Sequence, residues 1–260
     1  MAMKFSIKMV GLLKGNMKNK TFIVAEIGVN HNGKIEIAER LIDIAEKVGA
    51  DAVKFQCWGI NTFPELNFLR LGFPELNHLK MLTAGKNIIW FCTPFDFAAV
   101  KFLSSINNPI WKIPSNKAVW NNYDLMNEIV KASKGKPIFI SLGISSVRQI
   151  ENFIPDFINR EAVLFHCVSN YPTLPENANF RKLKSLIEYR DENGFSYSVG
   201  FSDHSGLPEM PVVAVGLGAR FIECHLTFDK NAEGADHRSS LDPEEFASMV
   251  KMIRNVEKGL

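Results

Sequence analysis

Two lysines of the sequence, Lys54 and Lys112, each lie inside a short apolar run, where an ammonium group is unusual. Hydroxyl side chains lie in or just after other apolar runs, at Thr93, Ser115, Ser141 and Ser202. A lysine acts on an anion as a point charge, and hydroxyl groups add hydrogen-bond donors. If the fold brings these runs together, the set predicts a pocket for a phosphate or a carboxylate group.

Two histidines, His204 and His225, follow two apolar runs near the end of the chain. Neutral imidazole nitrogens bind divalent metal ions, and Asp203 or Glu223 could orient the two rings or join the ligands. Two histidines also occur together in ordinary protein cores. The residues alone therefore leave both a metal site and a structural pair open.

Two further carboxylates are Glu26, at the end of the first apolar run, and Asp236, in the loop after the last one. They could bind substrate hydroxyls or transfer a proton, and the alternative is that they pair with the two lysines. The other histidines carry less information. His166 fits a core position as well as a functional one, and His237 is left without a role.

Short apolar runs alternate with amphipathic segments along the chain, which is typical of strand–helix pairs. The runs predict strands at 21–27, 52–55, 88–92, 110–113, 137–141, 162–167, 197–200 and 220–224. Helical spacing predicts helices at 35–48, 96–105, 121–133, 146–158, 178–190, 207–217 and 243–257. Asn32 is the expected N-cap of the first helix, and Phe-Pro-Glu-Leu-Asn at 63–67 and 73–77 predicts two short helical turns.

About eight such pairs without a linker predict an α/β protein with a parallel sheet, of the size of a single closed (β/α)8 TIM barrel. An open doubly wound sheet is the alternative, but residues 27–33 do not match the glycine-rich loop that such sheets carry after their first strand. In a barrel the carboxyl ends of the strands meet at one face. The polar residues named above would then share one site.

The composition fits one globular protein of 260 residues, with 46% hydrophobic and 22% charged residues and a formal net charge of +2. No global field favours nucleic acid or an anionic membrane, and no apolar run is long enough to cross a membrane. The apolar run at 9–13 is too short for a secretory signal, so we expect a cytoplasmic protein with four reduced cysteines. We expect a short N-terminal arm or hairpin over 1–20 and a barrel over 21–260.

Seven motifs, which follow one another in the order of the predicted strands, resemble the sialic acid synthases. They are residues 22–33 (FIVAEIGVNHNG), 49–56 (GADAVKFQ), 92–96 (CTPFD), 111–115 (WKIPS), 200–204 (GFSDH), 223–227 (ECHLT) and 234–243 (GADHRSSLDP). The resemblance extends from about residue 20 to residue 257. The family includes N-acetylneuraminate, legionaminate and pseudaminate synthases and a spore-coat polysaccharide relative.

The resemblance implies a cytoplasmic, homodimeric transferase of polysaccharide biosynthesis that condenses phosphoenolpyruvate with an open-chain 2-acetamido sugar and releases phosphate. It implies a manganese or magnesium ion on His204 and His225. Phosphoenolpyruvate would contact Lys54, Thr93, Lys112, Ser115, Ser141, Asn170 and Ser202. The sugar would contact Glu26, Gln56, Tyr171 and Asp236. Among these residues, catalysis would rest on Glu26, Lys54, Lys112 and Asp236.

The sequence departs from the family in four places. Lys117 stands where an acidic residue is usual, Cys224 stands where a basic residue is usual, and the segment between Gln56 and Ile88 is shorter. The sequence ends at Leu260, where relatives continue into an antifreeze-like domain, so we expect a natural short form, a piece cut from a longer chain, or an enzyme that a separate chain completes. Two alternatives stay open: the same barrel with a different aldose acceptor, and a catalytically degenerate paralogue that binds a ligand or a partner.

Overall fold

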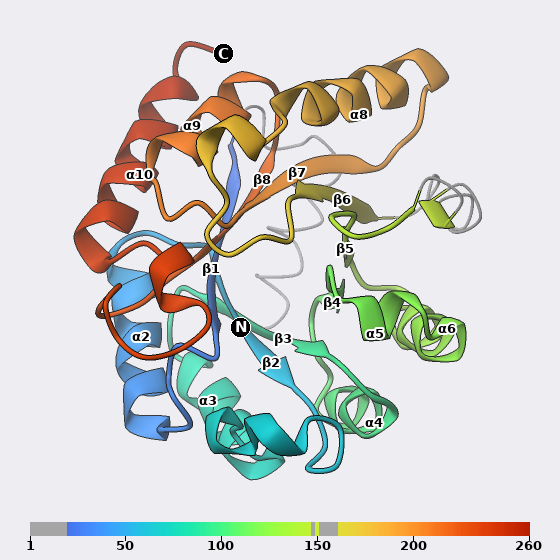
Figure 1. The fold of residues 1–260 in the computed structure, drawn as a ribbon, viewed down its shortest axis with the longest axis vertical. Helices are drawn as coiled ribbons and strands as arrows, with labels where there is room; N and C mark the ends of the chain where they lie inside the picture. The colour runs from blue at the N-terminus through green and yellow to red at the C-terminus, as the bar shows by residue number, and fades with distance from the viewer. Residues whose placement is uncertain (1–19, 147–148, 151–160) are drawn as a thin grey trace.

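Eight parallel strands surround a common centre, with the helices on the outside (Figure 1). The structure is a computed structural model, which describes residues 20–146, 149–150 and 161–260. The strands are β1 (Phe22–Gly28), β2 (Ala52–Cys57), β3 (Ile89–Pro94), β4 (Trp111–Ile113), β5 (Ile138–Ser141), β6 (Ala162–Cys167), β7 (Ser198–Asp203) and β8 (Phe221–His225). Their hydrogen-bonded order is β3-β2-β1-β8-β7-β6-β5-β4. The predicted (β/α)8 barrel is confirmed.

The helices follow the strands in the predicted alternation. They are α2 (Ile35–Lys47), α3 (Phe73–Thr83), α4 (Phe97–Ser105), α5 (Lys117–Trp120), α6 (Tyr123–Ala132), α8 (Phe180–Asn193), α9 (Glu209–Gly216) and α10 (Pro243–Val256), with short 3₁₀ turns at Pro64–Leu69, Pro175–Asn177 and His237–Ser239. The helix predicted over 146–158 and the arm predicted over 1–20 lie almost entirely outside the described residues. No helix in the described part of the chain is both long and apolar enough to cross a membrane.

Two local predictions were wrong. The second Phe-Pro-Glu-Leu-Asn segment starts an eleven-residue helix, α3, rather than a short turn, because Leu76, Leu79 and Thr83 recur on one buried face. Asn32 does not cap α2. Lys34 holds the N-cap position without a side-chain hydrogen bond, and Asn32 has a left-handed φ of 50° in the preceding turn.

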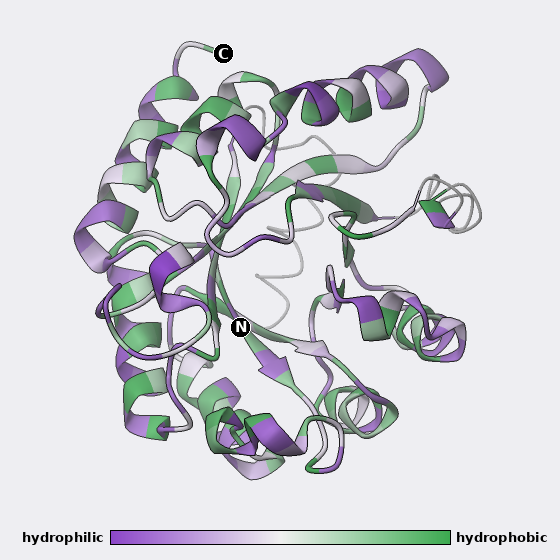
Figure 2. Cartoon of the chain, viewed as in Figure 1, coloured by the Kyte–Doolittle hydropathy of each residue, from purple (hydrophilic) through white to green (hydrophobic). Residues whose placement is uncertain are grey.

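The helices pack on the sheet through one apolar face each, so green and purple stripes alternate around the ring of helices (Figure 2). The helical spacing of 35–48 predicts one apolar face of Ala38, Leu41, Ile42, Ala45 and Val48; the first four are buried in α2, and Val48, which directly follows the helix, is partly buried. The four cysteines are buried and unpaired, also as predicted. The outer core therefore lies between the sheet and its helices.

Aromatic rings fill the inside of the barrel below the polar ends of the strands. Phe139 of β5 lies among them, with ring centroids 5.3 Å from Phe165, 5.6 Å from Phe221 and 5.8 Å from Phe91. Successive side chains of a strand point to opposite faces, so every second residue faces the inside. Two residues after Phe91, Phe139 and Phe221 come Thr93, Ser141 and Glu223. The same alternation thus builds an apolar floor and a polar layer above it.

Asn108 joins the two strands that end the hydrogen-bonded order. β3 and β4 lie next to each other but no strand ladder joins them. The fully buried Asn108 carboxamide accepts from the Cys92 N–H (3.3 Å) and donates to the carbonyl oxygens of Cys92 (3.3 Å) and Ile110 (2.7 Å). One side chain therefore closes the barrel between the strands that carry Thr93 and Lys112.

Candidate active site

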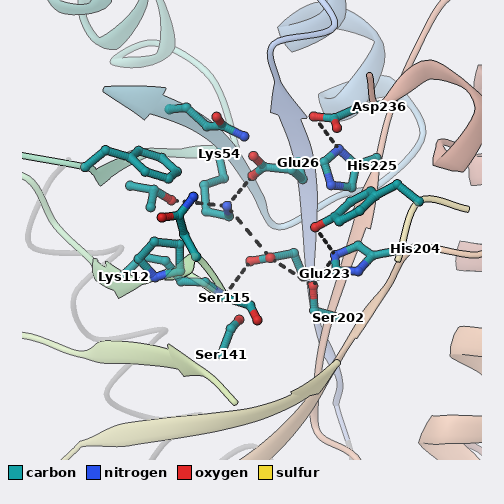
Figure 3. Close-up of a pocket in the computed structure, with 16 residues that line it drawn as sticks. Glu26, Lys54, Lys112, Ser115, Ser141, Ser202, His204, Glu223, His225 and Asp236 are labelled. Carbon is teal, nitrogen blue, oxygen red and sulfur yellow. Dashed lines mark hydrogen bonds and ion pairs between the residues drawn. The ribbon is translucent and has the colours of Figure 1, made fainter. Parts of the chain in front are cut away.

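A polar cavity lies at the carboxyl ends of the strands (Figure 3). Its lining residues are Glu26, Lys54, Gln56, Thr93, Phe95, Lys112, Pro114, Ser115, Asn116, Ser141, Tyr171, Ser202, His204, Glu223, His225 and Asp236. Each predicted site residue except Asn170 is among them. The exposed Asn170 side chain instead donates to the carbonyl of Pro172 (3.1 Å) and shapes the turn that follows β6.

Four buried charges alternate in sign across the cavity. Lys54 Nζ lies 2.5 Å from Glu26 Oε2 and 3.7 Å from Glu223 Oε1, and Lys112 Nζ lies 3.0 Å from Glu223 Oε2. Both lysines are at most 4% exposed, so water screens these contacts little. The pairing of Glu26 with a lysine, raised from sequence as an alternative to a chemical role, is present in the structure.

The two carboxylates of this chain of charges titrate differently. Burial raises the pKa of Glu26 to about 7, and the Lys54 ammonium offsets only part of that effect. Burial also acts on Glu223, but the attraction of Lys112 and Lys54 outweighs it and lowers the pKa of Glu223 to about 2. At neutral pH Glu223 is therefore ionised, while Glu26 can both give and take a proton.

The lysines respond to the same neighbours. Burial alone would lower the pKa of Lys54, yet Glu223 and Glu26 together raise it above its ordinary value. Burial lowers the pKa of Lys112, and its single carboxylate partner Glu223 offsets only part of that. Lys112 also lies 4.2 Å over the centre of the Phe165 ring, a cation–π contact with the barrel floor.

Hydroxyl groups gather on the side of the cavity next to Lys112. The Ser115 and Ser169 hydroxyls are hydrogen-bonded at 2.6 Å, and Gly143 lies against them. A Cβ atom at Gly143 would come within 2.6 Å of Ser115 Oγ and 2.7 Å of Cys167 Sγ. The glycine leaves room for these polar groups, which with Lys112 are suited to an anion.

Carboxylate and carboxamide groups gather on the opposite side, around Gly28. A Cβ atom at Gly28 would lie 3.0 Å from Glu26 Oε1 and 3.3 Å from both Asp236 Oδ2 and Gln56 Nε2. The residue has a φ of 54°, which favours glycine, and the β1–β2 register shifts between Glu26 and Gly28. Two hydrogen-bond acceptors, Glu26 and Asp236, and one donor, Gln56, thus converge at a residue without a side chain. This arrangement is suited to a ligand with several hydroxyl groups.

The two predicted metal ligands lie close together in an edge-to-face arrangement, with ring centroids 5.6 Å apart (Figure 3). His204 Nδ1 donates to the Val168 carbonyl (2.7 Å), which leaves Nε2 as an acceptor for the Tyr171 hydroxyl (3.1 Å). Burial lowers the pKa of His204 to about 4 and that of His225 to about 3. Both rings are therefore neutral at pH 7, as metal binding requires.

A metal ion on these rings would take most of its ligands from outside the protein. In the described part of the chain no three or more His, Cys, Asp or Glu side chains are grouped so that they could hold a metal ion. His225 Nδ1 is buried without a hydrogen-bond partner, 3.7 Å from Asp236 Oδ2. Two neutral imidazoles with an unpartnered nitrogen fit a divalent ion that keeps several water molecules.

Asp236 is held over the cavity by the loop that follows β8. His237 Nδ1 pairs with the Thr227 hydroxyl (2.7 Å), and its Nε2 pairs with Asn32 Oδ1 (3.2 Å) in the loop after β1. The Ser240 hydroxyl donates to the backbone carbonyl of Asp236 (2.6 Å). His237, which the sequence left without a role, therefore fastens the loop that carries Asp236.

Two residues, Glu223 and Asp203, were interpreted incompletely from sequence. Glu223 was considered only as a partner of the histidines, but it lies between the two lysines and accepts from the Ser202 hydroxyl (3.1 Å). Asp203 does not orient a histidine, because it accepts from the backbone and hydroxyl of Ser205. The spacing Glu223–His225, two residues on one strand, was the available sign that both face the cavity.

Two of the sequence departures lie away from the cavity. Lys117 is exposed at the first position of α5 and is not a lining residue, although Asn116 before it is. Cys224 faces outward, with its Sγ 3.5 Å from Met249 Sδ of α10. Neither of these two side chains lines the cavity, so neither supplies a group to it.

Comparison with known proteins identifies similar chains. The NeuB family matches residues 61–260. An uncharacterized protein of Methanocaldococcus jannaschii is 40% identical over 92% of this chain and 72% of its own length. The N,N'-diacetyllegionaminic acid synthase of Campylobacter jejuni is 32% identical over 93% of this chain and 78% of its own length.

Solved structures agree with the sequence comparison. The crystal structure of N-acetylneuraminic acid (sialic acid) synthetase from Leptospira borgpetersenii, in complex with citrate, matches with a TM-score of 0.82 and 32% identity, over 92% of this chain and 84% of that one. A truncated 3-deoxy-D-arabino-heptulosonate 7-phosphate synthase from Thermotoga maritima matches with a TM-score of 0.70 at 13% identity, over 93% of this chain and 88% of that one. The second likeness concerns the fold alone.

Proposed function

The chain belongs to the NeuB family, and we propose that it condenses phosphoenolpyruvate with an open-chain 2-acetamido sugar to give a nonulosonic acid of the sialic type and phosphate. The observation that carries the proposal is the division of one cavity into an anion side and a hydroxyl-binding side. The relatives named above include synthases of legionaminic and sialic acids. Their chemistry needs both sides.

The anion side suits phosphoenolpyruvate. Lys54 and Lys112 provide two buried positive charges, and Thr93, Ser115, Ser141 and Ser202 provide hydroxyl groups around them. In the proposed reaction, carbon 3 of the enol forms a bond to the aldehyde carbon of the sugar. A water oxygen adds at carbon 2, and the phosphate leaves. The lysines stabilise the departing negative charge through charge-assisted contacts.

The opposite side suits the sugar. Asp236 and Gln56 can bind its hydroxyl groups, and Tyr171 covers the adjacent His204 ring at a centroid distance of 4.2 Å. Glu26 lies between the two sides, with a pKa raised by burial to about 7. It is therefore placed to move a proton to the aldehyde oxygen as that oxygen becomes a hydroxyl group.

A divalent metal ion, manganese or magnesium, belongs to the proposal. When bound by His204 and His225 it would supply Lewis-acid polarisation of the aldehyde oxygen. The His204 tautomer is fixed by the Val168 carbonyl, so Nε2 presents its lone pair toward the cavity. This orientation is what the protein contributes to metal binding.

The test is release of inorganic phosphate from phosphoenolpyruvate by the purified protein. The assay contains manganese and a panel of 2-acetamido sugars that includes N-acetylmannosamine, with a chelator in parallel reactions. The proposal predicts release that needs one of the sugars and is lost with the chelator. Release with an aldose that lacks the acetamido group would indicate the alternative acceptor, and no release with any acceptor would contradict the synthase activity.

The homodimer and the cytoplasmic location expected from the resemblance remain part of this proposal. Light scattering of the purified protein tests the dimer, and a monomeric mass would withdraw it.

A further inference from the structure

The three groups best placed to hold an anion already hold one, the carboxylate of Glu223. Lys112 Nζ lies 3.0 Å from Oε2, the Ser202 hydroxyl donates to Oε1 at 3.1 Å, and Lys54 Nζ lies 3.7 Å from Oε1 (Figure 3). Glu223 enters from β8 and reaches between β2, β4 and β7. Its carboxylate thus has the contacts that a carboxylate or phosphate oxygen of a ligand would need.

Lys54 has no donor left for a second anion. An ammonium group has three N–H donors. Those of Lys54 face Glu26 at 2.5 Å, Thr93 Oγ1 at 3.2 Å and Glu223. Lys112 holds Glu223 at 3.0 Å, and the Phe165 ring covers its ammonium group from another side. An incoming anion that binds Lys54 must therefore replace an existing partner.

The charges of this cluster balance when Glu26 is ionised. Two lysines and two glutamates, Glu26 and Glu223, are each at most 5% exposed. Adding a multiply charged anion to a buried and balanced cluster is unfavourable unless one carboxylate gives up its lysine contacts. Glu26 holds Lys54 at 2.5 Å and Glu223 holds it at 3.7 Å, so Glu223 is the weaker of the two partners of Lys54.

We propose that Glu223 is an internal counterion that occupies the anion side of the free cavity and exchanges its lysine contacts with the phosphate or carboxylate group of a ligand. The inference rests on the proposed function, because it concerns the same cavity. Glu223 competes with the ligand when it enters and replaces it when it leaves. The residue therefore lowers the affinity for anions and speeds the release of phosphate.

Glu223→Gln tests the exchange, because glutamine keeps the shape of the side chain and removes its charge. Isothermal titration of the metal-loaded protein with inorganic phosphate and, separately, with phosphoenolpyruvate measures affinity without turnover. We expect both dissociation constants to fall by about tenfold or more, the effect of one charge-assisted contact regained. Inhibition by phosphate should become stronger in proportion. An unchanged or larger dissociation constant for phosphate overturns the proposal.

A matched control is Glu188→Gln, an exposed residue of α8 that pairs with Lys184 at 3.6 Å outside the cavity. It should leave both dissociation constants unchanged. If Glu223→Gln does not fold, Glu223→Asp keeps the charge and withdraws it from Lys112 by one methylene group. The aspartate variant should bind phosphate more tightly than the wild type, and equal or weaker binding overturns the proposal.

The two proposals fail in different ways. If the wild type binds phosphoenolpyruvate and Glu223→Gln does not bind it more tightly, the internal counterion is ruled out. The proposed function is then unaffected. Tighter phosphate binding by the variant, without condensation by the wild type, supports the counterion and contradicts the synthase. If the wild type and the variant bind neither anion, both proposals are wrong.

Discussion

Replacing Asn108 by alanine tests how the barrel is closed. The fully buried carboxamide makes three hydrogen bonds, two with the backbone of Cys92 and one with the carbonyl of Ile110. Each such bond contributes about 0.5–1.5 kcal/mol, so their loss should destabilise the protein by about 1.5–4.5 kcal/mol. The substitution leaves every lining residue of the cavity in place.

Urea unfolding followed by circular dichroism measures this loss as a lower midpoint. Asn122→Ala is the matched control, because Asn122 is an N-cap whose side chain accepts one hydrogen bond, from Leu125 N–H of α6 at 3.0 Å. Loss of such a cap costs about 1 kcal/mol. A shift for Asn108→Ala no larger than that of the control would refute the role of Asn108. A larger shift together with weaker phosphoenolpyruvate binding would connect the closure to the spacing of Thr93 and Lys112.

Three further predictions concern the cavity. Lys112→Met should weaken binding of phosphoenolpyruvate about 10- to 150-fold, which is the effect of one lost charge-assisted contact. An unchanged dissociation constant, measured by calorimetry, would remove Lys112 from the anion side. His225→Ala should weaken manganese binding by more than about tenfold, since half of the protein ligands are lost. Electron paramagnetic resonance measures this binding. Binding as tight as in the wild type would exclude His225 as a ligand. Gly28→Ala should raise the KM for the sugar, and Gly143→Ala should raise the KM for phosphoenolpyruvate, because each new Cβ crowds only its own side of the cavity. Steady-state kinetics measures both values. Equal effects of one variant on both substrates would contradict the division into two sides.

Much of the fold was predictable because the barrel repeats one simple pattern. The alternation of apolar runs and amphipathic segments predicted the eight strands. In the structure, the period of two along each strand brings Thr93, Ser141 and Glu223 to the inner face. The closure between β3 and β4 was not predictable. It depends on the buried side chain of Asn108, which lies in a turn and has no periodic signal.

The sequence predicted which residues line the cavity, but it did not predict which of them contact one another. Residues at the carboxyl ends of strands converge in any such barrel, which is why Lys54, Ser202 and His225 were found from their positions. Asn170, the predicted site residue that does not line the cavity, lies in the loop after β6, where neighbouring side chains do not alternate between two faces. Which carboxylate pairs with which lysine depends on side-chain reach across the barrel, and the sequence order of Glu26 and Glu223 does not specify it.

The most direct test of the central claim follows the carbon that forms the new bond. Phosphoenolpyruvate labelled with carbon-13 at carbon 3 is incubated with the protein, manganese and the 2-acetamido sugar that supports phosphate release, and the reaction is followed by nuclear magnetic resonance. The account predicts that the vinyl signal is replaced by that of a methylene group bonded to a hydroxyl-bearing carbon, with one phosphate released per product. Appearance of the methyl group of pyruvate would show hydrolysis without condensation, and this result would contradict the account, as would an unchanged vinyl signal.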